Sequence, residues 1–378
     1  MRTLNLMLCL LFIFLLAACQ SNNKEKSMIE KSSFGKLEEG TEAGLYILTN
    51  KTGASAKITN YGATVVSLMI PDKNGKFEDI VLGYDNPQDY SKGTSYFGAI
   101  VGRYGNRIGK GKFSIDGTEY KLAVNNGENH LHGGNIGYNK VMWNAEPLET
   151  ENGPSLKLTY LSRDGEEGYP GNVKLEVVYT LTNNNELKIE YSATTDKPTV
   201  FNPTHHSYFN LTGNTENKIL DHELMLNADQ YTPVDAGLIT TGKLENVENT
   251  PMDFRKPVKI GAGIDKDFEQ LKFGKGYDHN WVLRNWDKTV KLAATAYEPV
   301  SGRFMEVLTD QPGIQFYAGN FLDGTGSGKN GKPYQHRTGF CLETQHFPDS
   351  PNKPEFPSVR LNPGDTYKHT TIYKFSIK

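Results

Sequence analysis

Two neighbouring histidines and one glutamate are the side chains of this sequence best suited to acid–base chemistry. His205 and His206 lie in the segment FNPTHHSYFNL, and Glu343 directly follows the apolar run Phe-Cys-Leu. A carboxyl group in apolar surroundings loses hydration, which raises its pKa. A histidine titrates near neutral pH. These residue types therefore suit a pair in which one group removes a proton and the other donates one.

The alternation of side chains along a strand separates the two histidines. If residues 204–210 form a strand, His206 and Tyr208 project from one face, and His205 projects from the other. Only one histidine of the pair can then face a common site. We expect His206 to face it and His205 to pack or form hydrogen bonds behind it.

Further polar segments suggest a ligand rich in hydroxyl groups. GRYGNRIGKGKF places Arg103 and Arg107 among glycines, and GYDHNWVL brings Asp278 close to Trp281. The two arginines could bind a carboxylate or donate to hydroxyls, or they could form a structural ion pair in a turn. Carboxylates, arginines and aromatic rings such as Tyr208 and Trp281 together suit a sugar, whose hydroxyls take planar polar partners and whose apolar faces stack on rings.

A metal site is the alternative interpretation of NHLHGG. His130 and His132 have the spacing of residues on one face of a strand, and Glu343 could complete a set of two histidines and one carboxylate. No cluster of Cys, His and Asp with defined spacing accompanies them, so we predict no metal ligands. Asp and Asn are plentiful, which leaves a bound Ca²⁺ possible, but no loop of fixed spacing marks its site.

The elements that must position these residues are strands. Apolar side chains alternate over 173–191 on both sides of an Asn-rich turn, which predicts a hairpin, and 113–122 contains a second hairpin around Asp116-Gly117. Long segments with helical periodicity are missing. We therefore predict an all-β fold, a large antiparallel β-sandwich in a single domain with few, short helices.

The first residues indicate export. An uncharged apolar run follows Arg2 and ends in Leu-Ala-Ala-Cys, which resembles a bacterial lipobox. This predicts a signal peptide over 1–18, a lipidated Cys19 and a flexible tether over 19–33, ahead of a catalytic domain over 34–378. The residue after the lipobox cysteine is Gln20 and not the aspartate that would signal retention in the inner membrane. We therefore expect a lipid anchor on the periplasmic side of the outer membrane. The alternative is an ordinary cleavable signal with a chance cysteine.

Net charge and cysteine content limit the classes of binding partner and the disulfides that this chain can have. The formal net charge is −3 at pH 7, which argues against nucleic acid because nucleic-acid binding needs a basic face. Of three cysteines, Cys9 lies in the signal segment and Cys19 in the lipobox, so Cys341 has no partner for an internal disulfide. We expect a monomer.

Seven motifs occur in the order found in aldose 1-epimerases, the galactose mutarotases, over about residues 34–378. They are GRYGNRIGKG, LHGG, DGEEGYPG, NPTHHSYFNL, YDHNW, QPGIQFYAGNFLDG and GFCLETQHFPDS. The resemblance implies a large β-sandwich and interconversion of the α and β anomers of free aldohexoses such as D-glucose and D-galactose. It also implies that Glu343 is the catalytic base and His206 the catalytic acid. The implied sugar contacts are Asn106, Arg107, His132, Tyr208, Asp278 and Gln315. The lipoprotein leader, and a histidine at 205 where relatives commonly have Asn, depart from the typical form.

Three other functions fit part of the pattern. A non-catalytic sugar-binding lipoprotein would keep Asp278, Arg107 and the aromatic residues, but it would not need both Glu343 and His206. A glycoside hydrolase would use the carboxylates of Glu343 and Asp278. An epimerase of phosphorylated hexoses would need additional basic residues. Anomer exchange oxidises nothing and releases no group, so no redox cofactor is required.

Overall fold

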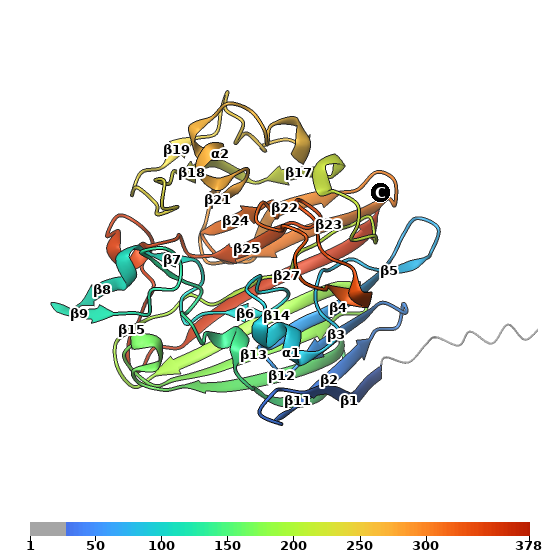
Figure 1. Ribbon diagram of the computed structural model, residues 1–378, viewed down its shortest axis with the longest axis horizontal. Helices are drawn as coiled ribbons and strands as arrows, with labels where there is room; N and C mark the ends of the chain where they lie inside the picture. The colour runs from blue at the N-terminus through green and yellow to red at the C-terminus, as the bar shows by residue number, and fades with distance from the viewer. Residues whose placement is uncertain (1–27) are drawn as a thin grey trace, which may run out of the picture.

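A computed structural model describes residues 28–378, and antiparallel strands dominate its secondary structure (Figure 1). Within these residues the α-helices are α1 (Pro87–Lys92) and α2 (Glu269–Gly274), each only six residues long. None of the described helices has the length and apolar composition that a membrane crossing requires. The prediction of an all-β chain with few, short helices is confirmed.

The largest sheet contains nine strands in the order β11-β12-β13-β14-β27-β23-β22-β17-β20. Their bounds are β11 Asn144–Thr150, β12 Gly153–Ser162, β13 Val173–Leu181, β14 Glu186–Thr195, β17 Glu223–Leu226, β20 Val258–Lys259, β22 Lys291–Tyr297, β23 Arg303–Thr309 and β27 Tyr367–Ile377. Strands β13 and β14 pair from Val173↔Thr195 to Leu181↔Leu187, which confirms the hairpin predicted over 173–191.

Two five-stranded sheets complete the main framework. The first has the order β1-β2-β3-β4-β5, with bounds Met28–Lys36, Glu42–Thr49, Ser55–Thr59, Thr64–Pro71 and Phe77–Asp79. The second has the order β19-β18-β21-β24-β25, with bounds Glu245–Asn246, Ala228–Thr232, Asp278–Leu283, Gly313–Tyr317 and Cys341–Gln345. Every pairing within these sheets is antiparallel.

One hydrophobic core joins the three sheets. A single cluster of buried side chains contains Val177 of β13 and Tyr373 of β27, together with Leu68 of β4 and Phe316 of β24. Both five-stranded sheets therefore bury their apolar faces in the core that covers the nine-stranded sheet. This shared core makes the described chain one domain with the layered architecture of a β-sandwich, as predicted.

Short strand pairs lie between the sheets and carry several of the polar motifs. They are β6 (Ile100–Val101) with β16 (Thr204–His205), β7 (Arg107–Ile108) with β10 (His130–Leu131), β8 (Lys112–Ile115) with β9 (Thr118–Lys121), and β15 (Thr199–Val200) with β26 (Arg360–Leu361). The β8–β9 turn has positive φ at both Asp116 and Gly117, as a type I′ turn requires, which confirms this hairpin.

The N-terminal boundary differs from the prediction. Residues 28–33, which we assigned to the flexible tether, form the first part of β1 and pair with β2 from Met28↔Thr49 onward. Ile29 packs partly buried against the core, which favours the strand. The folded domain therefore begins before residue 34. The predicted signal segment 1–18, the lipidation site Cys19 and the tether residues up to 27 lie outside the described residues.

Candidate active site

Three neighbouring strands place the central polar side chains on one sheet face. Gln315 of β24 lies directly opposite Glu343 of β25, and Asp278 of β21 lies opposite Tyr317. Directly opposed residues of antiparallel strands project to the same face, as do residues two apart on one strand. Asp278, Gln315 and Glu343 are therefore neighbours on that face, although the sequence separates them widely.

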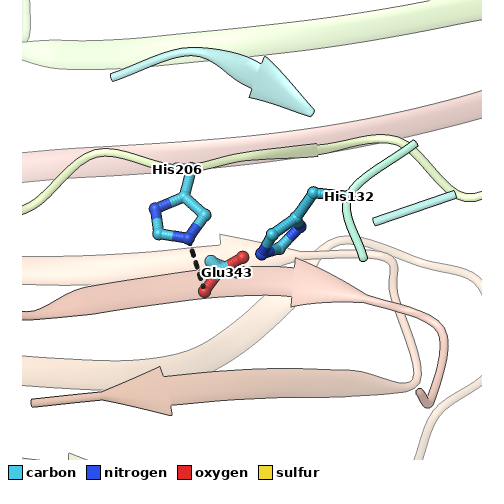
Figure 2. Close-up of side chains that lie close together, drawn as sticks. All are labelled: His132, His206 and Glu343. Carbon is cyan, nitrogen blue, oxygen red and sulfur yellow. Dashed lines mark ion pairs between the residues drawn. The ribbon is translucent and has the colours of Figure 1, made fainter. Parts of the chain in front are cut away.

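Glu343 and His206 lie next to each other in the lining of a cavity. Nε2 of His206 lies 3.6 Å from Oε1 of Glu343, and both side chains are almost fully buried. Figure 2 shows that the rings of His206 and His132 are both directed toward the Glu343 carboxylate. Within the described residues, the other carboxylate oxygen, Oε2, has no hydrogen-bond partner. An unpaired buried oxygen is costly, and it leaves this atom ready to accept a proton or a hydroxyl group.

The two adjacent histidines face opposite ways, as predicted. Nε2 of His205 contacts the Ser207 hydroxyl at 2.7 Å, and its Nδ1 lies 3.3 Å from the Tyr179 hydroxyl, inside the core. His206 instead lines the cavity and stacks on the ring of Tyr208, with centroids 5.2 Å apart. Only His206 of the pair can therefore reach a ligand, and Tyr208 supports its ring.

Asp278 is held by two of the predicted sugar-binding residues. Nε2 of Gln315 donates to Oδ1 of Asp278 at 2.7 Å, and a guanidinium nitrogen of Arg107 lies 3.8 Å from Oδ2. Nε of Arg107 also donates to the Asn126 side-chain oxygen. Asp278 and Arg107 are fixed before any ligand binds, which suits them to orient hydroxyl groups.

The backbone at Asn106 fixes the tautomer of His132. Asn106 has a φ of 69°, and its backbone N–H donates to Nδ1 of His132 at 3.1 Å. Nδ1 must therefore be unprotonated, and the hydrogen of the neutral ring lies on Nε2. Because Nε2 faces Glu343 in the cavity, His132 presents a hydrogen-bond donor there.

This tautomer weighs against a metal at the same place. Within residues 28–378, the one set of His and carboxylate ligand atoms close enough to share an ion is His132, His206 and Glu343, whose atoms lie within 4.8 Å of one another. A metal-binding histidine offers a lone pair to the ion and donates its other N–H outward. His132 does the reverse, since it accepts a hydrogen bond from Asn106 and directs its N–H inward. The donor set therefore does not fit a metal without rearrangement.

Burial shifts the proton affinities of the central pair in opposite directions. Burial raises the pKa of Glu343 well above its usual value; the nearby charge of Asp278 raises this pKa further, and that of Arg107 lowers it. Burial lowers the pKa of His206 to about 4, so its ring is neutral at pH 7. Burial also raises the pKa of Asp278, against the opposing effect of Arg107. Uncharged forms are favoured because this site is poorly hydrated.

The cavity has a volume of about 840 Å³, at the upper end of the range for small-molecule sites. Seven of the eight predicted catalytic and sugar-contacting residues line it. The eighth, Gln315, forms a hydrogen bond with Asp278, which lines the cavity. Sequence reasoning did not identify Tyr96 and Asn126, which also line it. The Tyr96 ring lies 4.7 Å from that of His132, but Tyr96 belongs to none of the motifs, so no signal marked it.

Three sequence interpretations are wrong. Arg103 donates to backbone carbonyls and to Ser162 in the interior, because its side chain points away from the cavity. His130 does not share a face with His132, since it binds the Tyr169 hydroxyl at 2.6 Å while the positive φ of His132 turns that residue out of the strand. Trp281 is fully buried and donates to a backbone carbonyl, so it cannot stack on a sugar.

Comparison with known proteins identifies the family of this chain. The family model of aldose 1-epimerase matches residues 44–374. Galactose mutarotase of Bos taurus is 44% identical over 349 residues, which cover 92% of this chain and 99% of the bovine protein. Aldose 1-epimerase of Escherichia coli is 37% identical over 89% of this chain and 96% of that protein.

A solved structure agrees as well. Galactose 1-epimerase from Lactobacillus acidophilus superimposes with a TM-score of 0.82 at 30% identity, over 93% of this chain and 99% of that protein. The family model covers most of the chain, and its relatives match over nearly their whole lengths. The chain belongs to the aldose 1-epimerase family.

Proposed function

We propose that Glu343 and His206 act as general base and general acid in the interconversion of the α and β anomers of free aldohexoses, such as D-glucose and D-galactose. The ionised carboxylate of Glu343 removes the proton of the hydroxyl on C1, the C1=O bond forms, the bond from C1 to the ring oxygen breaks, and Nε2–H of His206 protonates that oxygen. The negative charge thereby passes from the Glu343 carboxylate to the His206 ring, and it returns when the ring closes again. The open-chain aldehyde rotates about C1–C2. The same proton transfers in reverse then close the ring on the other face.

The short separation of the two groups is the observation that supports these roles. The oxygen that loses a proton and the oxygen that gains one are both bonded to C1, so the base and the acid must lie side by side. Nε2 of His206 and Oε1 of Glu343 are 3.6 Å apart. Burial raises the pKa of Glu343 above its usual value, which makes its carboxylate a stronger base.

The surrounding polar groups would hold the sugar in place. His132 presents an N–H toward Glu343, and Asp278 and Arg107 present an acceptor and donors that are already fixed. Asn106 sets the His132 tautomer, Gln315 restrains Asp278, and Tyr208 supports the His206 ring. These residues contribute by positioning the substrate and the catalytic pair.

The geometry favours this reaction over glycoside hydrolysis. A retaining hydrolase needs two carboxyl groups about 5–5.5 Å apart on the two sides of the scissile bond. Here Asp278 is held by Gln315 and Arg107, and the group next to Glu343 is the imidazole of His206.

Polarimetry tests the proposal. We expect the protein to accelerate equilibration of freshly dissolved α-D-glucose or α-D-galactose above the buffer rate. Glu343→Gln and His206→Asn should each lower kcat by about 10²–10⁴-fold while the fold is retained. A wild-type rate equal to the buffer rate would refute the enzymatic role and favour sugar binding without catalysis. Release of reducing sugar from an aryl glycoside would favour the hydrolase.

We further propose that Cys19 carries a lipid anchor that holds a monomeric enzyme on the periplasmic side of the outer membrane. The Leu-Ala-Ala-Cys sequence before Gln20 supports this proposal. The residues in the lining of the cavity that carry the proposed chemistry all come from one chain, which supports a monomeric enzyme. A Cys19→Ala variant should become soluble and stay active. A variant that remains membrane-bound would contradict the anchor, and light scattering of the soluble form would reveal an oligomer.

A further inference from the structure

Cys341 lies directly behind the proposed catalytic acid. Its sulfur is 3.6 Å from Nδ1 of His206, and the residue is fully buried. Cys341 precedes Glu343 by two residues on β25, so both side chains project from the same face of the strand. One strand therefore carries the base and a group in contact with the acid.

We propose that Cys341 is a positioning residue whose S–H donates to Nδ1 of His206 and thereby keeps the hydrogen of the neutral ring on Nε2. A neutral imidazole carries one N–H, and its two nitrogens compete for it. A donor at Nδ1 makes that nitrogen the acceptor, so the hydrogen stays on Nε2, 3.6 Å from Oε1 of Glu343. Nε2 is the nitrogen that must donate to the ring oxygen of the sugar.

The environment supports this direction of the hydrogen bond. Burial raises the pKa of the Cys341 thiol well above its usual value, so the sulfur keeps its hydrogen at neutral pH. Within residues 28–378 no other side chain forms a hydrogen bond with Nδ1 of His206. Glu343 faces the other ring nitrogen, Nε2, and the rings of Tyr96, Tyr208 and His132 contact the imidazole in tilted, stacked and edge-on packing.

The competing tautomer has its hydrogen on Nδ1. The acceptor would then be the sulfur, which is a weak acceptor, or the carbonyl oxygen of His206 itself, which it would share with the backbone N–H of Gly98 at 2.9 Å. That tautomer would also leave Nε2 without the proton that the ring oxygen requires. The role of Cys341 parallels that of the Asn106 backbone at His132, where an N–H on Nδ1 again leaves Nε2–H facing the cavity.

The test compares Cys341→Ala, which removes the donor, with Cys341→Ser, which replaces it by a hydroxyl. The proposal rests on the catalytic role of His206, so wild-type polarimetry comes first and decides that role separately. We expect Cys341→Ala to lower kcat by about 3- to 10-fold, the effect of one weak hydrogen bond, with KM unchanged. Cys341→Ser should restore most of kcat.

Nitrogen NMR of the histidine rings supplies a readout that does not depend on activity. In the wild type and in Cys341→Ser, neutral His206 should carry its hydrogen on Nε2, and in Cys341→Ala a substantial fraction should carry it on Nδ1. Leu342→Val is the matched control, because Leu342 is the buried neighbour on the opposite face of β25. It should lower the thermal stability without changing the His206 tautomer.

Three results would overturn the proposal. The first is a wild-type protein whose neutral His206 is protonated on Nδ1. The second is a folded, active Cys341→Ala variant with wild-type kcat and an unchanged tautomer. Equal losses of activity in Cys341→Ala, Cys341→Ser and Leu342→Val would show that Cys341 acts only through packing.

Discussion

The stability of this protein should fall steeply when the pH drops below neutrality, because most of its histidines are buried in the neutral form. Burial lowers the pKa of His130, His206 and His222 to about 4, and that of His205, His279 and His346 to about 3. In the unfolded chain each histidine has a pKa of about 6.5. As the pH falls, the unfolded chain therefore binds protons before the native state does.

The size of the effect follows from these shifts. A histidine with a lowered native pKa contributes stability that is complete above the unfolded pKa and is lost as the pH falls toward the native value. For His222, with a pKa of about 4, the free energy of unfolding should decrease by about 2 kcal/mol between about pH 7.5 and pH 5. Six such histidines lose about 12 kcal/mol together, similar to the total stability of about 5–15 kcal/mol of a typical domain.

Urea unfolding followed by tryptophan fluorescence at the two pH values measures this loss. His222→Gln provides the comparison, since Nε2 of His222 accepts the Leu211 backbone N–H and a glutamine oxygen can replace that acceptor without titrating. The variant should be less sensitive to pH by about 2 kcal/mol over the same interval. An unfolding midpoint that does not change between about pH 7.5 and pH 5 would refute the reasoning, because it would require protonated histidines in the native core.

Three further predictions concern the site. Glu343→Gln should unfold at a higher temperature than the wild type at alkaline pH. The raised pKa of Glu343 means that its ionisation costs stability as the pH rises, and glutamine does not ionise. Calorimetry at two pH values should show that the difference in unfolding temperature between the variant and the wild type grows with pH. Asp278→Asn should lower the pKa of Glu343 in the pH profile of kcat/KM, because the charge of Asp278 raises this pKa. Arg107→Gln should raise it, because the charge of Arg107 lowers it. Shifts of the same sign in both variants would contradict these assignments. His205→Asn should cost about 1–3 kcal/mol of stability through its lost contacts with Ser207 and Tyr179, yet retain kcat per folded molecule.

Alternation and turn chemistry were sufficient to predict the all-β class and two of the hairpins. The β13–β14 hairpin follows from side chains of period two on both sides of an Asn-rich turn, and the β8–β9 hairpin follows from Asp116-Gly117. The same rule separated His205 from His206 correctly, although only the first residues of that segment form a regular strand. Local geometry of this kind is encoded by neighbours in the sequence.

Residue spacing failed where the backbone leaves regular geometry. His130 and His132 have the spacing of one strand face, but the φ of 51° at His132 turns its side chain toward the cavity and leaves His130 against Tyr169. Tyr96 also has a positive φ, of 58°, and reaches the site from a segment without a motif. Arg103 and Arg107 lie on the same glycine-rich segment, yet only Arg107 reaches the cavity. Such positions depend on contacts with distant segments, which the sequence does not show.

The site defines the positions of its titratable hydrogens as well as the positions of its side chains. Asn106 sets the hydrogen of His132 through a backbone N–H, and Gln315 supplies a donor to Asp278, which remains an acceptor on that side. Acid and base must exchange roles when the ring closes again, so each needs one defined proton position and one free position. Oε2 of Glu343 provides the free acceptor, and its lack of a partner is a cost that a site built only for sugar binding would not need. Proton transfer to and from two oxygens on the same carbon therefore requires both features, the unpaired carboxylate oxygen and the fixed imidazole hydrogens.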